Sequence, residues 1–428
     1  MSRRHSPASK LKTFIRRHGI DVILWSLLIG VIGGLSSAGY REANIWLTHS
    51  FTRTCGDIVA IAESLDGLER LLIPTMGGFL AGILLTLARR YPGGKTGQDY
   101  LEAIRTNDGV IPFRATLIRL ASSLFSVSSG SSIGREGGMV QLSAMLISVL
   151  GQKGRMPPER LRLLVGCGGA AGLAAAYNTP LAGALFIAEI VTGSLAMEVL
   201  GPLIIAAFTS TLVVRHWIGA HPIFTSRDIM LTQEVDLMPL LGLGVLCGIL
   251  APIFMVGLNL SRKGFDRLHL PTCLRLAFGG LGIGLLSLKT PEVWGNGYSV
   301  VESLLSQPQE PSQIAMILGM KVLATFLAVG SGAIGGVFTT TLLLGASTGW
   351  LFGSALTLLC PSLGADPVYF SAVAMGAFLA GTTHAPIMAI LMIFEMTLDA
   401  NLVFPLILSA LIAGYLSRIL HSRSIYQR

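Results

Sequence analysis

The chain has 428 residues, of which 52% are hydrophobic and 13% charged, and its mean hydropathy is +0.67. Soluble proteins carry about 25% charged residues, so the composition excludes an ordinary soluble protein and indicates an integral membrane protein. The net charge of +8 does not indicate nucleic-acid binding, because the cations gather at the ends of apolar segments. The five cysteines are spread singly, which indicates neither a disulfide framework nor a metal site, and no cofactor is expected.

The chain begins with a basic arm, residues 1–20, that precedes the first apolar segment. Further arginines, Arg418, Arg423 and Arg428, follow the last apolar segment. Under the positive-inside rule both termini are therefore expected in the cytoplasm. The arm does not read as a cleavable signal, because the apolar run continues and no small-residue cleavage site follows.

Six apolar windows could span a bilayer or contribute to a span: 22–40, 71–87, 202–214, 240–258, 274–288 and 402–415. A spanning helix needs about 20 apolar residues. Several windows are shorter than that, and the 51 glycines and 19 prolines interrupt others. Such short, broken segments predict discontinuous helices around a buried polar path.

Between the second and third windows, residues 128–138 form a small, polar stretch that carries Arg135 and Glu136 side by side. A carboxylate at membrane depth is costly, so Glu136 is a functional-site candidate. The apolar run 139–150 predicts a helix whose N-terminal N–H groups favour an anion. The site could hold either a mobile anion or the Glu136 carboxylate. Arg135 could anchor the segment or attract anions.

The two halves of the chain repeat the same features in the same order. The matched positions lie 200 to 206 residues apart and are Gly97 with Gly297, Ser129 with Ser331, Pro180 with Pro386, and Glu189 with Glu395. Four ordered pairs at a nearly constant offset indicate a real repeat, with a first repeat over 21–218 and a second over 236–428. The glycine-rich stretches near 134 and 336 are expected to meet at the interface between the repeats, where such transporters bind substrate. The offset does not say whether the repeats are inverted or parallel.

Three motifs in this order resemble those of the CLC family of chloride channels and anion/proton exchangers, and within it the bacterial ClcB type. Residues 134–137, GREG, are similar to the family's GREGP motif, with Gly138 in place of its proline. Residues 335–340, GGVFTT, resemble its GxFxP motif, with Thr340 in place of its proline. Residues 424–426, SIY, resemble the segment that supplies the pore tyrosine. The likeness covers nearly the whole chain.

The resemblance implies an all-α polytopic membrane fold with two antiparallel repeats and about eighteen helices, many of them tilted or partial. It also implies a homodimer in the bacterial inner membrane, in contact with lipid, with one chloride pathway per subunit. Glu136 would be the gate and would compete with the anion for an outer site. The groups implied to bind the anion are the backbone N–H groups of Arg135, Glu136 and Gly137 at the outer site, with those of Val337 and Phe338 and the hydroxyl of Tyr426 at the central site.

Two departures from the family pattern bear on function. A family loop with a pore serine corresponds here to residues 94–98, and gapless spacing puts Lys95 at the serine position, with Thr96 as another source of a hydroxyl. The inner glutamate that passes protons in exchangers corresponds to Ile190, and Glu189 is its neighbour. Isoleucine cannot relay a proton, because its side chain has neither donor nor acceptor.

Three functions remain open at this point. The first is a chloride-selective channel gated by Glu136, which could act as an electrical shunt in acid resistance, and the alternatives are a chloride/proton antiporter and a fluoride exporter. A membrane-embedded enzyme is not expected, because the sequence has no HExxH or paired-Asp motif and no GxSxG in a strand–turn–helix context. Each candidate pore element also has a purely structural interpretation. Residues 336–338 could serve close helix packing, Tyr426 could be an interfacial tyrosine, and Lys95 could be a solvated loop lysine.

Overall fold

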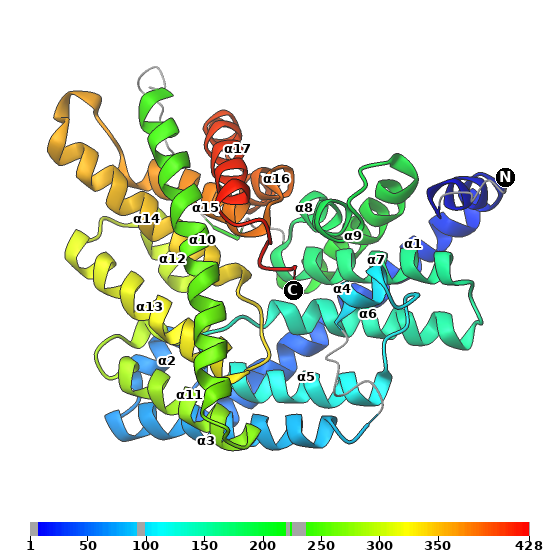
Figure 1. Ribbon diagram of the computed structural model, residues 1–428, viewed down its shortest axis with the longest axis horizontal. Coiled ribbons are helices and arrows are strands. Elements are labelled where there is room, and N and C mark those ends of the chain that lie inside the picture. The colour runs from blue at the N-terminus through cyan, green and yellow to red at the C-terminus, as the bar shows by residue number, and fades with distance from the viewer. Residues whose placement is uncertain (1–6, 92–98, 220–222, 225–236, 428) are drawn as a thin grey trace. The chain divides into compact units, whose positions relative to one another are not determined.

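The computed structural model describes residues 7–91, 99–219, 223–224 and 237–427, with the side chains from residue 19 onward except those of residues 217, 218 and 362. These residues form seventeen α-helices and no strand beyond one isolated bridge, which confirms the all-α prediction (Figure 1). The α-helices are α1 (Pro7–Thr52), α2 (Ile58–Ser64), α3 (Gly67–Ala88), α4 (Tyr100–Arg105), α5 (Phe113–Ser128), α6 (Glu136–Lys153), α7 (Pro158–Tyr177), α8 (Pro180–Leu185), α9 (Met197–Ile218), α10 (Leu237–Arg267), α11 (Thr272–Ser287), α12 (Tyr298–Ser306), α13 (Pro311–Ser331), α14 (Phe338–Leu359), α15 (Pro367–Thr383), α16 (Pro386–Thr397) and α17 (Val403–Leu420). The short helices are a π-helix, η1 (Phe186–Thr192), and the 3₁₀ helices η2 (Pro291–Val293), η3 (Pro361–Leu363) and η4 (Ala400–Leu402).

The chain forms two compact units, and boundaries between them fall within α1, α5 and α6 and at the last residue of α3. Unit 1 consists of Met1–Arg41, Ala88–Ile118 and Gly138–His221. Its centre is α7, a nearly all-buried helix that packs against α9, α8 and α4. A Cβ at Gly172 of α7 would lie 2.8 Å from the Cα of Val140, so this glycine lets α7 approach α6 closely.

Unit 2 consists of Glu42–Leu87, Arg119–Gly137 and Pro222–Arg428. The pair α14 and α15 forms its most extensive helix contact, and α10, α15 and α17 pack on one another (Figure 1). A Cβ at Gly349 of α14 would lie 2.1 Å from the carbonyl oxygen of Phe370, so the two helices touch backbone to backbone. The glycine at this position therefore permits the close packing of α14 on α15.

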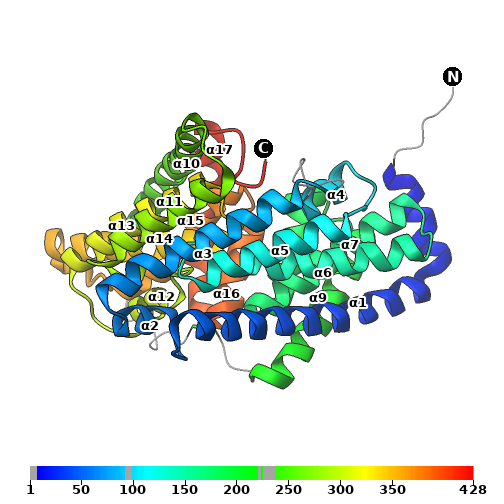
Figure 2. The same ribbon diagram turned by 90° about the horizontal axis from the view of Figure 1, so that it is seen from below.

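The helices α3 and α11 occupy equivalent positions in the two sequence repeats, and they cross in close contact (Figures 1 and 2). A Cβ at Gly78 would lie 2.4 Å from the carbonyl oxygen of Leu276, and one at Gly280 would lie 2.1 Å from that of Pro74. Adding 202 to the residue numbers of Pro74 and Gly78 gives Leu276 and Gly280, so the two contacts are equivalent in the two repeats. The next glycine of each helix, four residues further on, makes an equivalent pair of contacts. Residue numbers rise along α3 while those of its contacts fall along α11. The equivalent helices are thus antiparallel, so the repeats are inverted, as the resemblance implied.

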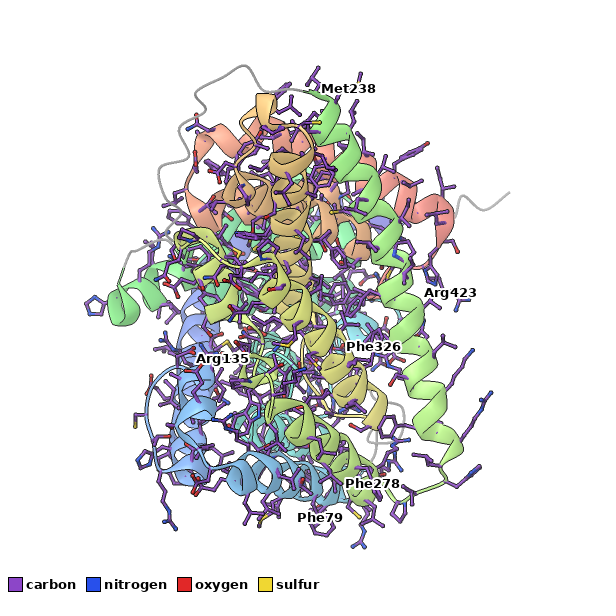
Figure 3. All side chains as sticks on the ribbon, turned by 90° about the vertical axis from the view of Figure 1, so that its left-hand side faces the viewer. Phe79, Arg135, Met238, Phe278, Phe326 and Arg423 are labelled. Carbon is purple, nitrogen blue, oxygen red and sulfur yellow. The ribbon has the colours of Figure 1, made fainter. Side chains whose placement is uncertain are left out.

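Within the described part of the chain, seven helical segments are long and apolar enough to cross a bilayer: Gly19–Thr52, Gly67–Ala88, Met197–His216, Leu237–Arg267, Pro311–Ser331, Phe338–Leu359 and Ala400–Leu420. Five of the six predicted windows lie inside these spans, and the window 274–288 coincides with the shorter α11. Phe79 of α3 and Phe278 of α11 are 40% and 51% exposed at the outer surface of their helices (Figure 3), as expected for side chains that face lipid.

Candidate functional site

The glycine-rich stretches of the two repeats meet at the one isolated β-bridge of the described chain. The N–H of Gly134 donates to the carbonyl oxygen of Gly336 at 2.7 Å, and the N–H of Gly336 donates to that of Gly134 at 2.9 Å. Each helix that follows begins two residues later, α6 at Glu136 and α14 at Phe338. Two helix N-termini therefore begin next to one bridge, and each carries unpaired N–H groups and a partial positive charge.

The side chain of Glu136 is buried and holds two hydrogen bonds from the second half of the chain. Asn296 Nδ2 donates to Glu136 Oε1 at 2.5 Å, and the hydroxyl of Thr339 donates to the same oxygen at 2.9 Å. Both partners are donors, and the carboxyl oxygen accepts from both. Thr339 lies in the first turn of α14, so the carboxylate is at the N-terminus of that helix, where negative charge is favoured. The second oxygen, Oε2, is buried without a hydrogen-bond partner among the described residues.

Asn296 is oriented by the start of α12. The N–H of Tyr298 donates to Asn296 Oδ1 at 3.2 Å, so the amide nitrogen faces Glu136. Sequence reasoning singled out neither Asn296 nor Thr339. Thr339 stands inside the quoted 335–340 motif, whereas Asn296 lies 160 residues from Glu136 in a loop that no motif marks.

The residues predicted for the central anion site lie at two places in unit 2. Val337 precedes α14, and Phe338 is its first residue and is 4% exposed. Tyr426 is half-buried in the segment after α17, where the N–H of Ile425 donates to the carbonyl oxygen of Thr382 at 3.0 Å. That bond holds the segment to the end of α15. The joint anion site of Val337, Phe338 and Tyr426 stays a prediction.

The two prolines missing from the family motifs have different surroundings here. A Cβ at Gly138 would lie 2.2 Å from the Tyr40 hydroxyl, so the buried Tyr40 ring occupies the space that a side chain would need. Thr340 is fully buried in the first turn of α14. Arg135 and Gly137 are both half-buried; Arg135 directly precedes α6 and Gly137 is in its first turn.

The remaining predicted residues are Lys95, Thr96 and Ile190. Lys95 and Thr96 fall outside the described residues. Ile190 is 8% exposed and lies in the π-helix η1, whose last carbonyl groups accept hydrogen bonds from the Arg105 guanidinium. Glu189, the neighbouring acid, is half-buried. The π-helix was not predicted, although such segments often occur at functional sites.

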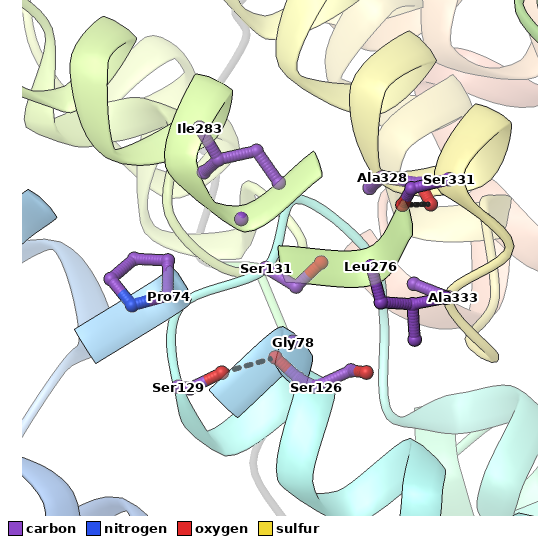
Figure 4. Close-up of a pocket in the computed structure, with 11 residues that line it drawn as sticks. Pro74, Gly78, Ser126, Ser129, Ser131, Leu276, Ile283, Ala328, Ser331 and Ala333 are labelled. Atoms are coloured by element: carbon purple, nitrogen blue, oxygen red, sulfur yellow. Dashed lines mark hydrogen bonds between the residues drawn. The ribbon is translucent and has the colours of Figure 1, made fainter. Parts of the chain in front are cut away.

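A small cavity beside the crossing of α3 and α11 is bounded also by α13 and the end of α5 (Figure 4). Its polar lining includes Ser126, Ser129, Ser131 and Ser331. The hydroxyl of Ser129 donates to the carbonyl oxygen of Ser126 at 3.1 Å, and that of Ser331 donates to the carbonyl oxygen of Ala328 at 2.8 Å. Ser129 and Ser331 thus each satisfy a backbone carbonyl group in the last turn of α5 and α13, respectively. None of the eleven residues that line the cavity belongs to the predicted anion sites.

The sequence and the fold both have named relatives. Residues 77–418 match the family described as "Voltage gated chloride channel". The chain is 46% identical over 394 residues to a ClcB-like chloride channel protein of Ralstonia nicotianae, covering 91% of this chain and 92% of that one. It is 40% identical over 412 residues to the voltage-gated ClC-type chloride channel ClcB of Citrobacter koseri, covering 95% and 98%.

Solved structures give the same result. The fold is similar to that of a slow cyanobacterial Cl⁻/H⁺ antiporter, with a TM-score of 0.81 and 26% identity over 95% of this chain and 96% of that one. It is also similar to that of a CLC-type fluoride/proton antiporter, with a TM-score of 0.78 and 23% identity over 96% and 98%. The chain therefore belongs to the voltage-gated chloride channel family, the CLC family.

Proposed function

We propose that this protein is a chloride-selective channel whose pathway is gated by Glu136 and which does not exchange protons obligatorily. One observation carries the proposal: the Glu136 carboxylate lies at the N-terminus of α14, held by Asn296 and Thr339. A helix N-terminus favours any anion. A carboxylate in this position competes with chloride for the same favourable field.

Protonation would release this gate. The carboxylate accepts two hydrogen bonds from neutral donors and lies in the positive field of α14, and both interactions favour its charged form. A protonated carboxyl has lost the charge that these contacts stabilise, so it leaves the position more easily. Chloride flux should accordingly rise on acidification.

The absence of an acid at position 190 favours a channel over an antiporter. A proton exchanged for chloride must travel between Glu136 and the cytoplasm, and Ile190 offers no group that could carry it. The named relatives at 40 to 46% identity are called chloride channels, which supports the same reading. The chloride/proton antiporter remains the second candidate, because the similar structure at 26% identity carries that name.

The experiment is chloride efflux from proteoliposomes, measured from pH 7.5 down to pH 4.5 with the parent protein and Glu136→Gln. The parent should conduct more chloride as the pH falls, whereas Glu136→Gln should conduct at every pH, because its amide cannot ionise. A Glu136→Gln variant with the full acid response of the parent would exclude Glu136 as the gate. Fluoride efflux in the same vesicles tests the third candidate, a fluoride exporter, which would conduct fluoride in preference to chloride.

The wider setting follows from the same proposal. A passive chloride path in a bacterial inner membrane can act as an electrical shunt that dissipates charge during acid stress. We infer a homodimer, each subunit with its own pathway, and cytoplasmic termini on the basis of the basic residues at both ends of the chain. Cross-linking in native membranes and accessibility of cysteines introduced at the termini test these two points.

A further inference from the structure

Lys321 is the single charged residue of α13, and its side chain is fully buried. It lies near the middle of a segment long and apolar enough to cross the membrane. A charged side chain in such a place is costly and needs close partners. Neither the sequence motifs nor the proposed gate accounts for it.

The ammonium group of Lys321 is held by the carbonyl oxygens of four consecutive residues. Lys321 Nζ lies 3.3 Å from the carbonyl oxygen of Glu292, 3.0 Å from that of Val293, 3.3 Å from that of Trp294 and 2.9 Å from that of Gly295. All four are acceptors, and a protonated amine has only donors. Hydrogen bonds from a charged donor are stronger than neutral ones, so Lys321 fixes the backbone of this segment.

The fixed segment leads directly into Asn296, which contacts the gate. Asn296 is flanked by Gly295 and Gly297, whose φ angles are +66° and +92°. Glycine adopts such angles readily, but its backbone is also more flexible than that of other residues. The position of Asn296 therefore depends on the contacts that hold these two neighbours in place. Lys321 anchors the carbonyl group of Gly295, the residue immediately before Asn296.

We propose that Lys321 is a positioning residue for the gate: by binding the carbonyl groups of residues 292–295, it keeps the Asn296 amide on the Glu136 carboxylate. This inference rests on the proposed gating function of Glu136. The bond from Asn296 stabilises the carboxylate against its protonated form. Lys321 therefore sets how acidic the medium must be before the gate opens.

Few other charged groups lie on the segments around this contact. Arg135 precedes Glu136 in the chain, and Glu292 attracts Lys321 electrostatically. The helix α14 has no charged side chain, and α12 has only Glu302, which is exposed. All of these groups stay in place in the variants below, so their effects cancel when variants are compared.

The test is a double-mutant cycle in which the pH of half-maximal chloride efflux is measured. Asn296→Leu removes the amide donor and should raise this pH by about one to two units, the equivalent of one hydrogen bond to a charged group. Lys321→Met should shift it in the same direction and by no more than Asn296→Leu does. The double variant should match Asn296→Leu alone, because Lys321 acts through Asn296.

Thr325→Val is the matched control. Thr325 lies one turn further along α13 and is also fully buried, but its hydroxyl donates to the backbone carbonyl oxygen of Lys321 at 2.8 Å and contacts Ser132, and it does not reach the 292–295 segment. It should keep the parental half-activation pH. Shifts that add in the double variant, or a Lys321→Met variant with the parental value, would overturn the proposal.

Two further readouts cover the remaining outcomes. If Lys321→Met does not yield folded protein, Lys321→Gln takes its place in the cycle, because it keeps two N–H donors on a shorter side chain. Lys321→Gln should shift the half-activation pH upward, and an unshifted value would refute the inference. If Glu136→Gln keeps the parental acid response, the proposed gating function of Glu136 itself is wrong. Results from the Lys321 variants alone test only the positioning role of Lys321, so the two failures can be told apart.

Discussion

Gly134 and Gly336 exchange backbone hydrogen bonds at 2.7 and 2.9 Å, although they are equivalent residues of the two repeats. A residue can pair with its own equivalent only where the axis that relates the repeats passes between them. Because α6 and α14 both begin two residues after this pair, the axis brings together two helix N-termini. The two positions are alike in backbone but differ in what surrounds them, since only the first repeat contributes Glu136.

This difference gives a prediction with an internal control. A Cβ at Gly134 would lie 1.8 Å from Glu136 Oε2, so Gly134→Ala must displace the carboxylate. A Cβ at Gly336 would lie 3.6 Å from the same oxygen, an ordinary contact. Chloride efflux at pH 7 should therefore rise in Gly134→Ala and stay near the parental value in Gly336→Ala. Equal efflux in both variants would show that the carboxylate position does not limit conduction.

The crossing of α3 and α11 should be intolerant of a single methyl group. In Gly280→Ala the new Cβ would lie 2.1 Å from the carbonyl oxygen of Pro74, a backbone atom that cannot easily move. Overpacking of this kind costs about 1–3 kcal/mol. Gly319→Ala in α13 is the control, because its Cβ would meet open space. The midpoint temperature of thermal unfolding in detergent should be lower than the parental value only in Gly280→Ala. An unchanged midpoint in Gly280→Ala would contradict the close crossing of the two helices.

The existence of the repeat and the start of α6 could be predicted from the sequence because both depend on local patterns, whereas the inversion of the repeats could not be read from those patterns. Glycines next to an apolar run mark a helix start, and matched pairs mark a repeat. The six apolar windows predicted from the sequence did not include the spans Pro311–Ser331 and Phe338–Leu359. Lys321 interrupts the first of them, and threonines and glycines dilute the second.

The partners of Glu136 could not be predicted in the same way. Asn296 and Glu136 are 160 residues apart, and only the folded chain brings them together. A lone lysine in the apolar stretch 314–329 was a usable signal for Lys321, since an intramembrane charge is a functional-site hypothesis by default. Its carbonyl partners carry no sequence signal, because every residue has a carbonyl group.

The proposed pore role of Tyr426 can be measured directly. A tyrosine hydroxyl that donates to a bound anion should contribute about 1.5–3 kcal/mol, so Tyr426→Phe and Tyr426→Ala should bind chloride more weakly in calorimetry. The bond from Ile425 to Thr382 is made by the backbone and should hold the chain end in both variants. Unchanged chloride affinity in Tyr426→Ala would remove Tyr426 from the site.

The stability of the protein should fall in acid partly through His384, which caps α15 outside the seven spans. Burial lowers the pKa of His384 from 6.5 to about 4, and the charges of Arg418 and His421 act in the same direction. Between these two values the unfolded chain binds more protons than the folded one, so stability is lost as the pH falls from about 6.5 towards 4.

His384→Asn tests this, because Asn178 already caps the equivalent helix α7 with a similar left-handed φ. The variant should lose less stability than the parent when unfolding midpoints in detergent are compared between pH 7 and pH 4.5. If both proteins lose the same amount, His384 does not titrate as its burial requires.

Proton coupling is the property that separates the two leading functions. In proteoliposomes with an imposed chloride gradient and recorded internal and external pH, the parent should move chloride without moving protons uphill. Glu189 is not expected to replace the missing relay at Ile190, since neighbouring residues of a helix point in different directions, and Glu189→Gln should leave the result unchanged.

Ile190→Glu should then install coupling. The position is buried in η1, and the Arg105 guanidinium binds the carbonyl oxygen of the same residue. A glutamate at this position supplies the proton-exchanging group that isoleucine lacks. Chloride-driven proton uptake in Ile190→Glu and none in the parent would identify residue 190 as the missing relay. Uphill proton movement at a fixed ratio in the parent would instead establish an antiporter whose protons bypass Ile190.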